Sequence, residues 1–213
     1  MLPAPAAGRV VAFCLGTFLV YLDGRRIAGW RGEKAESLLQ YLLSHPAQPV
    51  ARGALTRALW PHPAASPPAD SLKDAVDALR KTLVRTSGVA DRPLRVTSHR
   101  TGYRLQAEGL WVDVAAFEHD CAVAERLEAE GRTAEAHNLY ARAVHLYAGD
   151  FLPNCQEEWA GATRRSLFHR YQHARSRLAG ATRAAGDYAG VALRRAASSA
   201  AAATAAGRTP TVR

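Results

Sequence analysis

The stretch from residue 70 to residue 105 constrains the fold of this 213-residue chain more than any other part of it. Its first half carries apolar residues at the spacing of one helical face: Leu72, Val76, Leu79 and Leu83. Asp70 or Ser71 can cap the first turn, because a side-chain oxygen there accepts a hydrogen bond from a free backbone N–H group. Gly88 ends the pattern. We therefore predict one amphipathic helix with a polar outer face.

A basic hairpin is predicted directly after this helix. Two short strand-like runs, residues 94–96 and 103–105, flank a turn that holds His99, Arg100 and Gly102. A helix with one polar face beside an arginine-bearing hairpin is the outline of a winged helix-turn-helix, which binds DNA. The plainer interpretation of the same residues is a surface helix and a solvated turn, so the preceding segments decide between the two.

The first thirty residues predict a small antiparallel sheet. Residues 10–21 form a β-rich apolar run that Gly16 interrupts. The pair Asp23-Gly24 is a strong hairpin signal because both residues tolerate a positive φ. Residues 25–28 would return as the next strand.

Two further helices are predicted between this sheet and the helix at residue 71. They cover residues 33–44 and 52–59, with a short link at Val50-Ala51. Residues 61–68 contain four prolines and predict a loop. The expected domain is therefore α+β, with an N-terminal antiparallel sheet, three helices and a C-terminal hairpin.

Three stretches of this domain resemble the OmpR-type winged helix of bacterial transcription regulators, and most closely its antibiotic-regulator branch, the AfsR/SARP type. They read WRGEKAESLLQYLLSHPAQPVARGALTRALWP, SLKDAVDALRKTL and TGYRL. The resemblance covers residues 10–106. It implies that the third helix enters the major groove of DNA while the hairpin reaches the neighbouring minor groove. It also implies that the loop of residues 62–69 contacts RNA polymerase, with His62, Ala64 and Ser66 as candidate contacts.

The second half of the chain predicts an all-α, tetratricopeptide-like domain. Helices are expected over residues 117–130, 134–147 and 159–185, each followed by a glycine or a turn. Small residues mark points where such helices approach closely: Ala124, Ala136 and Ala143. The run from LWVDV to AGDFL, residues 110–152, resembles the bacterial transcriptional activator domain that follows the winged helix in AfsR/SARP-type regulators.

These patterns divide the chain into four parts. A disordered N-terminus (1–9) precedes the winged helix domain (10–108) and a partial activator domain (111–190). Residues 191–213 have no apolar stripe and no acidic residue, so we expect a disordered, alanine- and arginine-rich tail. Because the family's activator domain continues with further helices, we expect either truncation or a frameshift at this end, with a natural short form as the alternative.

Eight residues are candidates for DNA contact: Ser71, Lys73, Asp74, Asp77, Arg80, Lys81, His99 and Arg100. The first four share the exposed face of the third helix and would read bases, since lysine favours guanine and a carboxylate can accept from the cytosine amino group. Arg80 and Lys81 would anchor phosphates, although Arg80 could instead pair with Asp77 at i+3. The hairpin pair His99 and Arg100 would meet the minor groove and adjacent phosphates.

The distribution of charge fits a nucleic-acid-binding module joined to a second, near-neutral one. The chain carries a net charge of +9, of which residues 1–110 contribute +7 and residues 111–190 contribute −2. No apolar run approaches the roughly 18 residues of a membrane span, so no membrane partner is expected.

The sequence predicts no enzyme, no cofactor and no metal site. Cys14, Cys121 and Cys155 lie far apart without a metal-ligand spacing, which indicates reduced cysteines in a cytoplasmic protein. His169 and His173 stand at i and i+4, but no glutamate follows the first as a zincin requires. Nucleophile-elbow, phosphate-loop and dinucleotide motifs are also missing from the sequence.

The leading hypothesis is a cytoplasmic transcription regulator, expected to be an activator, that recognises promoter repeats in double-stranded DNA and contacts RNA polymerase. Repeats would suit a homodimer on DNA. The alternative is a helical-repeat scaffold that binds a protein partner, with a winged helix that does not read DNA. A steep loss of DNA affinity with salt would separate the two.

Overall fold

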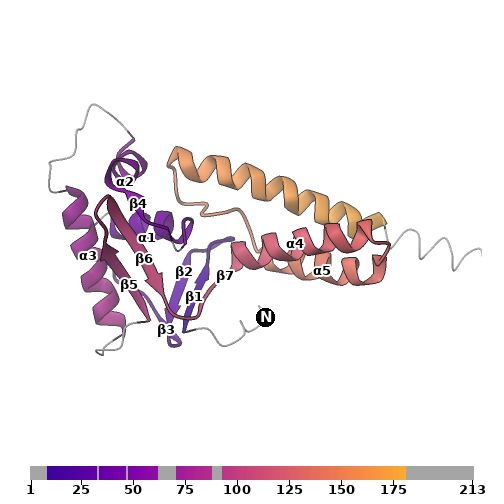
Figure 1. Ribbon diagram of the computed structural model, residues 1–213, viewed down its shortest axis with the longest axis horizontal. Helices are drawn as coiled ribbons and strands as arrows, with labels where there is room; N and C mark the ends of the chain where they lie inside the picture. Colours follow the sequence, from indigo (N-terminus) through magenta and orange to yellow (C-terminus); the bar gives the residue numbers. More distant parts are fainter. Residues whose placement is uncertain (1–8, 33, 47, 62–70, 88–92, 181–213) are drawn as a thin grey trace, which may run out of the picture.

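The computed structural model describes residues 9–32, 34–46, 48–61, 71–87 and 93–180 (Figure 1). Figure 1 shows two parts: small sheets packed with helices, and a group of long helices that extends away from them. Several expected features lie wholly or almost wholly outside the described residues. These are the helix cap at Asp70, the helix end at Gly88, the loop of residues 62–69 and both expected disordered tails.

The first sheet contains four strands in the order β3-β2-β1-β7. They are β1 (Val10–Phe13), β2 (Leu19–Leu22), β3 (Arg25–Arg26) and β7 (Leu110–Val112). Asp23 and Gly24 have φ angles of +46° and +79°, which confirms the turn predicted between β2 and β3. The sequence did not predict β7, whose three residues pair in parallel with β1. This strand returns the chain to the first sheet before the second part begins.

The three predicted helices form, and they pack against a second sheet that contains the predicted hairpin. They are α1 (Ala35–Leu43), α2 (Arg52–Leu59) and α3 (Ser71–Ser87), and the sheet has the order β4-β6-β5. Its strands are β4 (Val50–Ala51), β5 (Leu94–Ser98) and β6 (Gly102–Ala107). The predicted link at Val50-Ala51 is therefore a strand, because its two residues pair with Tyr103 and Gly102 of the hairpin.

One continuous apolar core holds these elements together. The predicted stripe of α3 is buried, and it meets leucines from α1 and α2 that are almost fully excluded from solvent, Leu38, Leu42, Leu55 and Leu59. Val96 and Leu105 of the hairpin belong to the same core. Burial of this stripe leaves the opposite face of α3 on the outside of the molecule.

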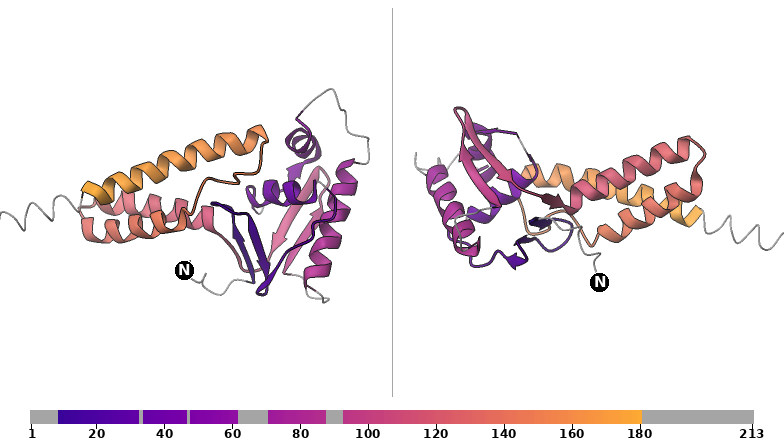
Figure 2. Two further views of the ribbon diagram at one scale, coloured as in Figure 1. Left: turned by 180° about the vertical axis from the view of Figure 1, so that it is seen from behind. Right: turned by 60° about the horizontal axis from the view of Figure 1, so that its bottom comes forward.

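The second part is a group of long helices (Figures 1 and 2). They are α4 (Asp113–Ala129), α5 (Thr133–Leu146) and the unlabelled helix of residues 158–180, drawn in orange. Ala124, Ala136 and Ala143 are fully buried between them, which confirms the predicted close approach. Phe117, Tyr140 and Leu167 belong to the same core. The predicted start of α4 at residue 117 is four residues late, because Asp113 already lies in its first turn.

The two parts are joined by backbone hydrogen bonds around a buried carboxylate. Asp113 is 1% exposed, and its oxygens accept from the N–H groups of Cys14 (2.8 and 2.9 Å), Leu15 (2.8 Å) and Val114 (2.8 Å). Beside it, the N–H group of Leu152 donates to the Cys14 carbonyl at 2.9 Å. The end of β1 is thus bound to both the start of α4 and the loop before residue 158.

Gly102→Ala should destabilise the winged helix. A Cβ atom there would lie 1.8 Å from the Val50 carbonyl oxygen, so β4 could not keep its pairing with β6. We expect a loss of at least about 2 kcal/mol in the free energy of unfolding, measured by urea denaturation. Gly53→Ala in α2 is the matched control: its new Cβ meets only the flexible end of Arg57, and it should be neutral or slightly stabilising. Equal stability of the two variants would contradict this packing.

Asp113→Ala should destabilise the junction, because it leaves the buried N–H groups of Cys14 and Leu15 without an acceptor. We expect a loss of about 2–4 kcal/mol in the free energy of unfolding. Burial raises the pKa of Asp113 to about 6, against the opposing effect of the backbone hydrogen bonds that it accepts.

The raised pKa also predicts how this loss depends on pH. The pKa of Asp113 in the folded state lies above the value of about 3.9 for an unperturbed aspartate. The contribution of this group to the free energy of unfolding is therefore complete below about pH 4 and declines as the pH rises through about 6. Urea denaturation should therefore show a larger gap between wild type and Asp113→Ala at pH 5 than at pH 7.5. A gap that stays constant would show that Asp113 does not titrate in this range.

Candidate nucleic-acid interface

The outer face of α3 presents the residues that the sequence singled out for base reading. Lys73 and Asp74 are exposed, while Ser71 and Asp77 are half-buried at the edge of the same face. α3 lies at the outer edge of the molecule, beside the hairpin of β5 and β6 (Figure 1). The helix thus offers an outer face that is polar over its first turns, and Val84 is exposed nearer its end.

Arg80 ties this helix to the hairpin. Its Nε donates to the Val96 carbonyl at 3.0 Å and one terminal nitrogen donates to the Ser98 hydroxyl at 3.1 Å. The other terminal nitrogen lies 3.5 Å from a carboxylate oxygen of Asp77, the i+3 pairing that the sequence left open. Arg80 therefore sets the position of β5 against α3. The neighbouring Lys81 is exposed.

The tip of the hairpin carries His99 and Arg100, both exposed. The backbone N–H groups of His99 and Gly102 each donate to the other's carbonyl, at 2.8 and 3.2 Å, and close the turn. No hydrogen bond or ion pair engages the Arg100 guanidinium among the residues that the structure describes. Its position is set by the turn, and its charge is available to a partner.

Sequence reasoning missed further exposed arginines near this surface. Arg104 lies between the buried Tyr103 and Leu105 on β6, so it faces solvent on the hairpin. Arg52, at the start of α2, places its guanidinium carbon 5.7 Å from the centre of the Tyr103 ring. The two-residue alternation of Tyr103-Arg104-Leu105 would have revealed Arg104. Only the fold brings Arg52 to the hairpin.

The remaining sequence-predicted positions lie elsewhere. His62, Ala64 and Ser66 fall outside the described residues. His169 and His173 are exposed on the helix of residues 158–180, where the ring of His173 lies 6.1 Å from that of Tyr140. Within the part of the chain that the structure describes, no group of three potential metal ligands forms, and no helix is long and apolar enough to cross a membrane. The three cysteines are buried and free.

Comparisons with known proteins agree with this architecture. Residues 112–207 match the model of the bacterial transcriptional activator domain. Among solved structures, the chain is similar to Mycobacterium tuberculosis EmbR, described in complex with a low affinity phosphopeptide, with a TM-score of 0.70 and 23% sequence identity. That likeness covers 90% of this chain and 50% of the EmbR chain, so the chain spans half the length of that structural relative. No curated protein matches.

The two comparisons support different parts of the prediction. The structural likeness confirms the predicted fold, a winged helix-turn-helix followed by a helical domain. The match to the family model begins at the last residue of β7 and confirms the identity of the helical part. Residues 112–207 thus match a bacterial transcriptional activator domain, and they follow a part of the chain with the fold of a winged helix.

Proposed function

We propose that the chain binds double-stranded DNA as a transcription regulator, with α3 in the major groove and the hairpin against the neighbouring minor groove. The observation that carries this proposal is the joint surface of α3 and the hairpin. Arg80 fixes the two elements to each other, and lysines and arginines project from both. A helix and a hairpin in fixed relation can follow two grooves at once.

The residues of this surface divide into two roles. Ser71, Lys73, Asp74 and Asp77 face outward from the first turns of α3, where a helix that enters a groove reaches base edges. The two carboxylates would favour the target sequence over other DNA. They repel phosphates in any sequence but can accept a hydrogen bond from a base with an amino group, such as cytosine.

Phosphate anchoring falls to the basic residues around that face. Lys81 projects freely from α3, and Arg100 and His99 project from the hairpin tip, with Arg104 on the same hairpin. Arg80 acts mainly by positioning the hairpin, because its donors already meet Val96 and Ser98. DNA affinity therefore depends on Arg80 through the geometry of the surface.

The wider assignment is an activator in the cytoplasm that recognises promoter repeats as a homodimer. RNA polymerase would be contacted through His62, Ala64 and Ser66. The match of residues 112–207 to a bacterial transcriptional activator domain supports the assignment as a transcriptional activator.

A second candidate function is a protein-binding scaffold. Two observations favour it: Asp74 and Asp77 reduce the positive charge of α3, and Phe168 is 42% exposed on the helix of residues 158–180. In that case the activator domain would carry the interaction and the winged helix would only pack against it.

Salt dependence of DNA binding distinguishes the two functions. Bound fragments are first selected from genomic DNA, and the affinity of the full chain is then measured between about 50 and 200 mM salt. Each phosphate contact contributes about −0.9 to the slope of log affinity against log salt concentration, so four or more contacts predict a slope steeper than about −3.5. Failure to enrich any sequence, or a flat and weak salt response, would favour the scaffold.

Arg100→Ala should weaken binding to target and scrambled duplexes by a similar factor. A hairpin arginine meets the backbone and the width of the minor groove, so its loss should reduce the salt slope by about 1 and leave base preference unchanged. Arg165→Ala, an exposed arginine of the helical domain, is the control of equal charge and should have little effect. A change in base preference at major-groove positions would contradict the placement of the hairpin.

A further inference from the structure

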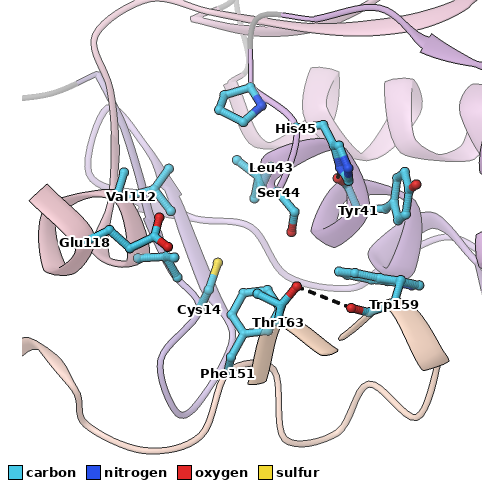
Figure 3. A pocket seen from close by; sticks show the side chains of 13 residues that line it. Cys14, Tyr41, Leu43, Ser44, His45, Val112, Glu118, Phe151, Trp159 and Thr163 are labelled. Carbon is cyan, nitrogen blue, oxygen red and sulfur yellow. Dashed lines mark hydrogen bonds between the residues drawn. The ribbon is translucent and has the colours of Figure 1, made fainter. Parts of the chain in front are cut away.

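A cavity of about 380 Å³ lies at the junction of the two parts (Figure 3). The winged helix contributes Cys14 after β1, and Tyr41 and residues 43–46 at the end of α1. The activator domain contributes Val114 and Glu118 from α4, together with Phe151 and Trp159. The size lies within the range of sites that bind small molecules, and the wall comes from both domains.

Several polar side chains of this wall already donate hydrogen bonds to backbone carbonyl groups. The Ser44 hydroxyl donates to the Gln40 carbonyl at 3.0 Å, and the Thr163 hydroxyl donates to the Trp159 carbonyl at 3.3 Å (Figure 3). Nδ1 of His45 lies 2.9 Å from the Tyr41 carbonyl, which can only accept. The imidazole therefore donates through Nδ1, and in the neutral ring Nε2 is the acceptor. What these groups offer a ligand is mainly the capacity to accept hydrogen bonds.

The charge of the wall is negative. Glu118 projects its carboxylate from α4 toward the cavity (Figure 3), and no described residue forms an ion pair or hydrogen bond with it. Neither lysine nor arginine is among the lining residues. Burial raises the pKa of Cys14 well above its usual range, so that thiol adds no second anion.

Aromatic rings form the wall opposite Glu118. The rings of Tyr41 and Trp159 meet edge to face with their centres 5.0 Å apart, and Phe151 lies 6.3 Å from Trp159. Arg164 holds this wall in place, because its guanidinium donates to the carbonyls of Phe151 and Leu152 at 2.9 and 2.7 Å. Aromatic faces attract cations and apolar groups alike.

We propose that this cavity binds a small organic cation: an amine carried on an aromatic or aliphatic body. The ammonium group donates to the Glu118 carboxylate and the neighbouring acceptors, and the body packs against Trp159 and Phe151. A wall that offers acceptors, one unpaired carboxylate and aromatic rings is complementary to such a ligand. The Glu118 carboxylate would repel an anion, and a neutral alcohol would bind without the charge attraction that an ammonium group gains.

Three probes of similar shape test this proposal: 2-phenylethylammonium, 2-phenylethanol and 3-phenylpropanoate. Binding to the full chain is measured at pH 7.5 by isothermal titration calorimetry. Amide shifts in a ¹⁵N-labelled sample locate the site. The cation should bind at least tenfold more tightly than the alcohol, and the carboxylate should bind least. Amide shifts should appear on both sides of the junction, at Ser44 and at Val114. Absence of binding by the cation at millimolar concentration, or equal affinities for the three probes, would overturn the proposal.

Glu118→Gln keeps the size of the side chain and removes its charge, and Glu118 is exposed, so the fold should be retained. The variant should lose at least tenfold in affinity for the cation while its affinity for the alcohol stays the same. Glu125→Gln is the matched control, since Glu125 is exposed two turns further along α4 and lies outside the cavity lining. Equal losses in the two variants would show that only the general negative charge of the helix attracts the probe and would refute the site.

Discussion

Asp113 accepts three hydrogen bonds from the N–H groups of Cys14 and Leu15, and the rest of the architecture depends on this arrangement. A strand end normally leaves its N–H groups to water, but here they are buried beneath the second domain. A carboxylate at the start of α4 satisfies them and fixes where the first helix of the activator domain begins. The parallel pairing of β7 with β1 brings Asp113 to this position. The junction between the domains is therefore a specific structure with buried polar contacts, unlike a flexible linker.

The surface proposed to bind DNA depends on a comparable arrangement at the other end of the winged helix domain. α3 and the hairpin share one apolar core, but a core alone permits small rotations of a surface hairpin. Arg80 removes that freedom through its bonds to Val96 and Ser98. Gly102 adds a second restraint, because only a residue without a side chain fits against the Val50 carbonyl. Helix and hairpin thus form one surface of defined shape, which two adjacent grooves of DNA require.

The cavity at the junction follows from the same construction. Joining the two domains at Asp113 leaves the end of α1 facing α4 and the helix of residues 158–180, and the side chains between them do not fill the space. Residues of both domains line it, so a bound molecule would contact both at once. The chemistry of the cavity is distinct from that of the surface proposed to bind DNA, since the cavity offers a carboxylate with aromatic rings and the surface offers mainly lysines and arginines.

The sequence by itself determined the order of the elements apart from the short strands β4 and β7, because local periodicity and turn chemistry specify the others. The stripe of α3, the Asp23-Gly24 turn, the hairpin and the small residues of the helical domain were all predicted from neighbouring residues. Tertiary structure decided what depends on distant partners. β7 is three residues long and exists only because β1 lies beside it. Arg80 and Arg52 take their roles from the hairpin, and Asp113 takes its role from Cys14, 99 residues earlier. Pairings of this kind carry no local periodicity, so only the folded chain reveals them.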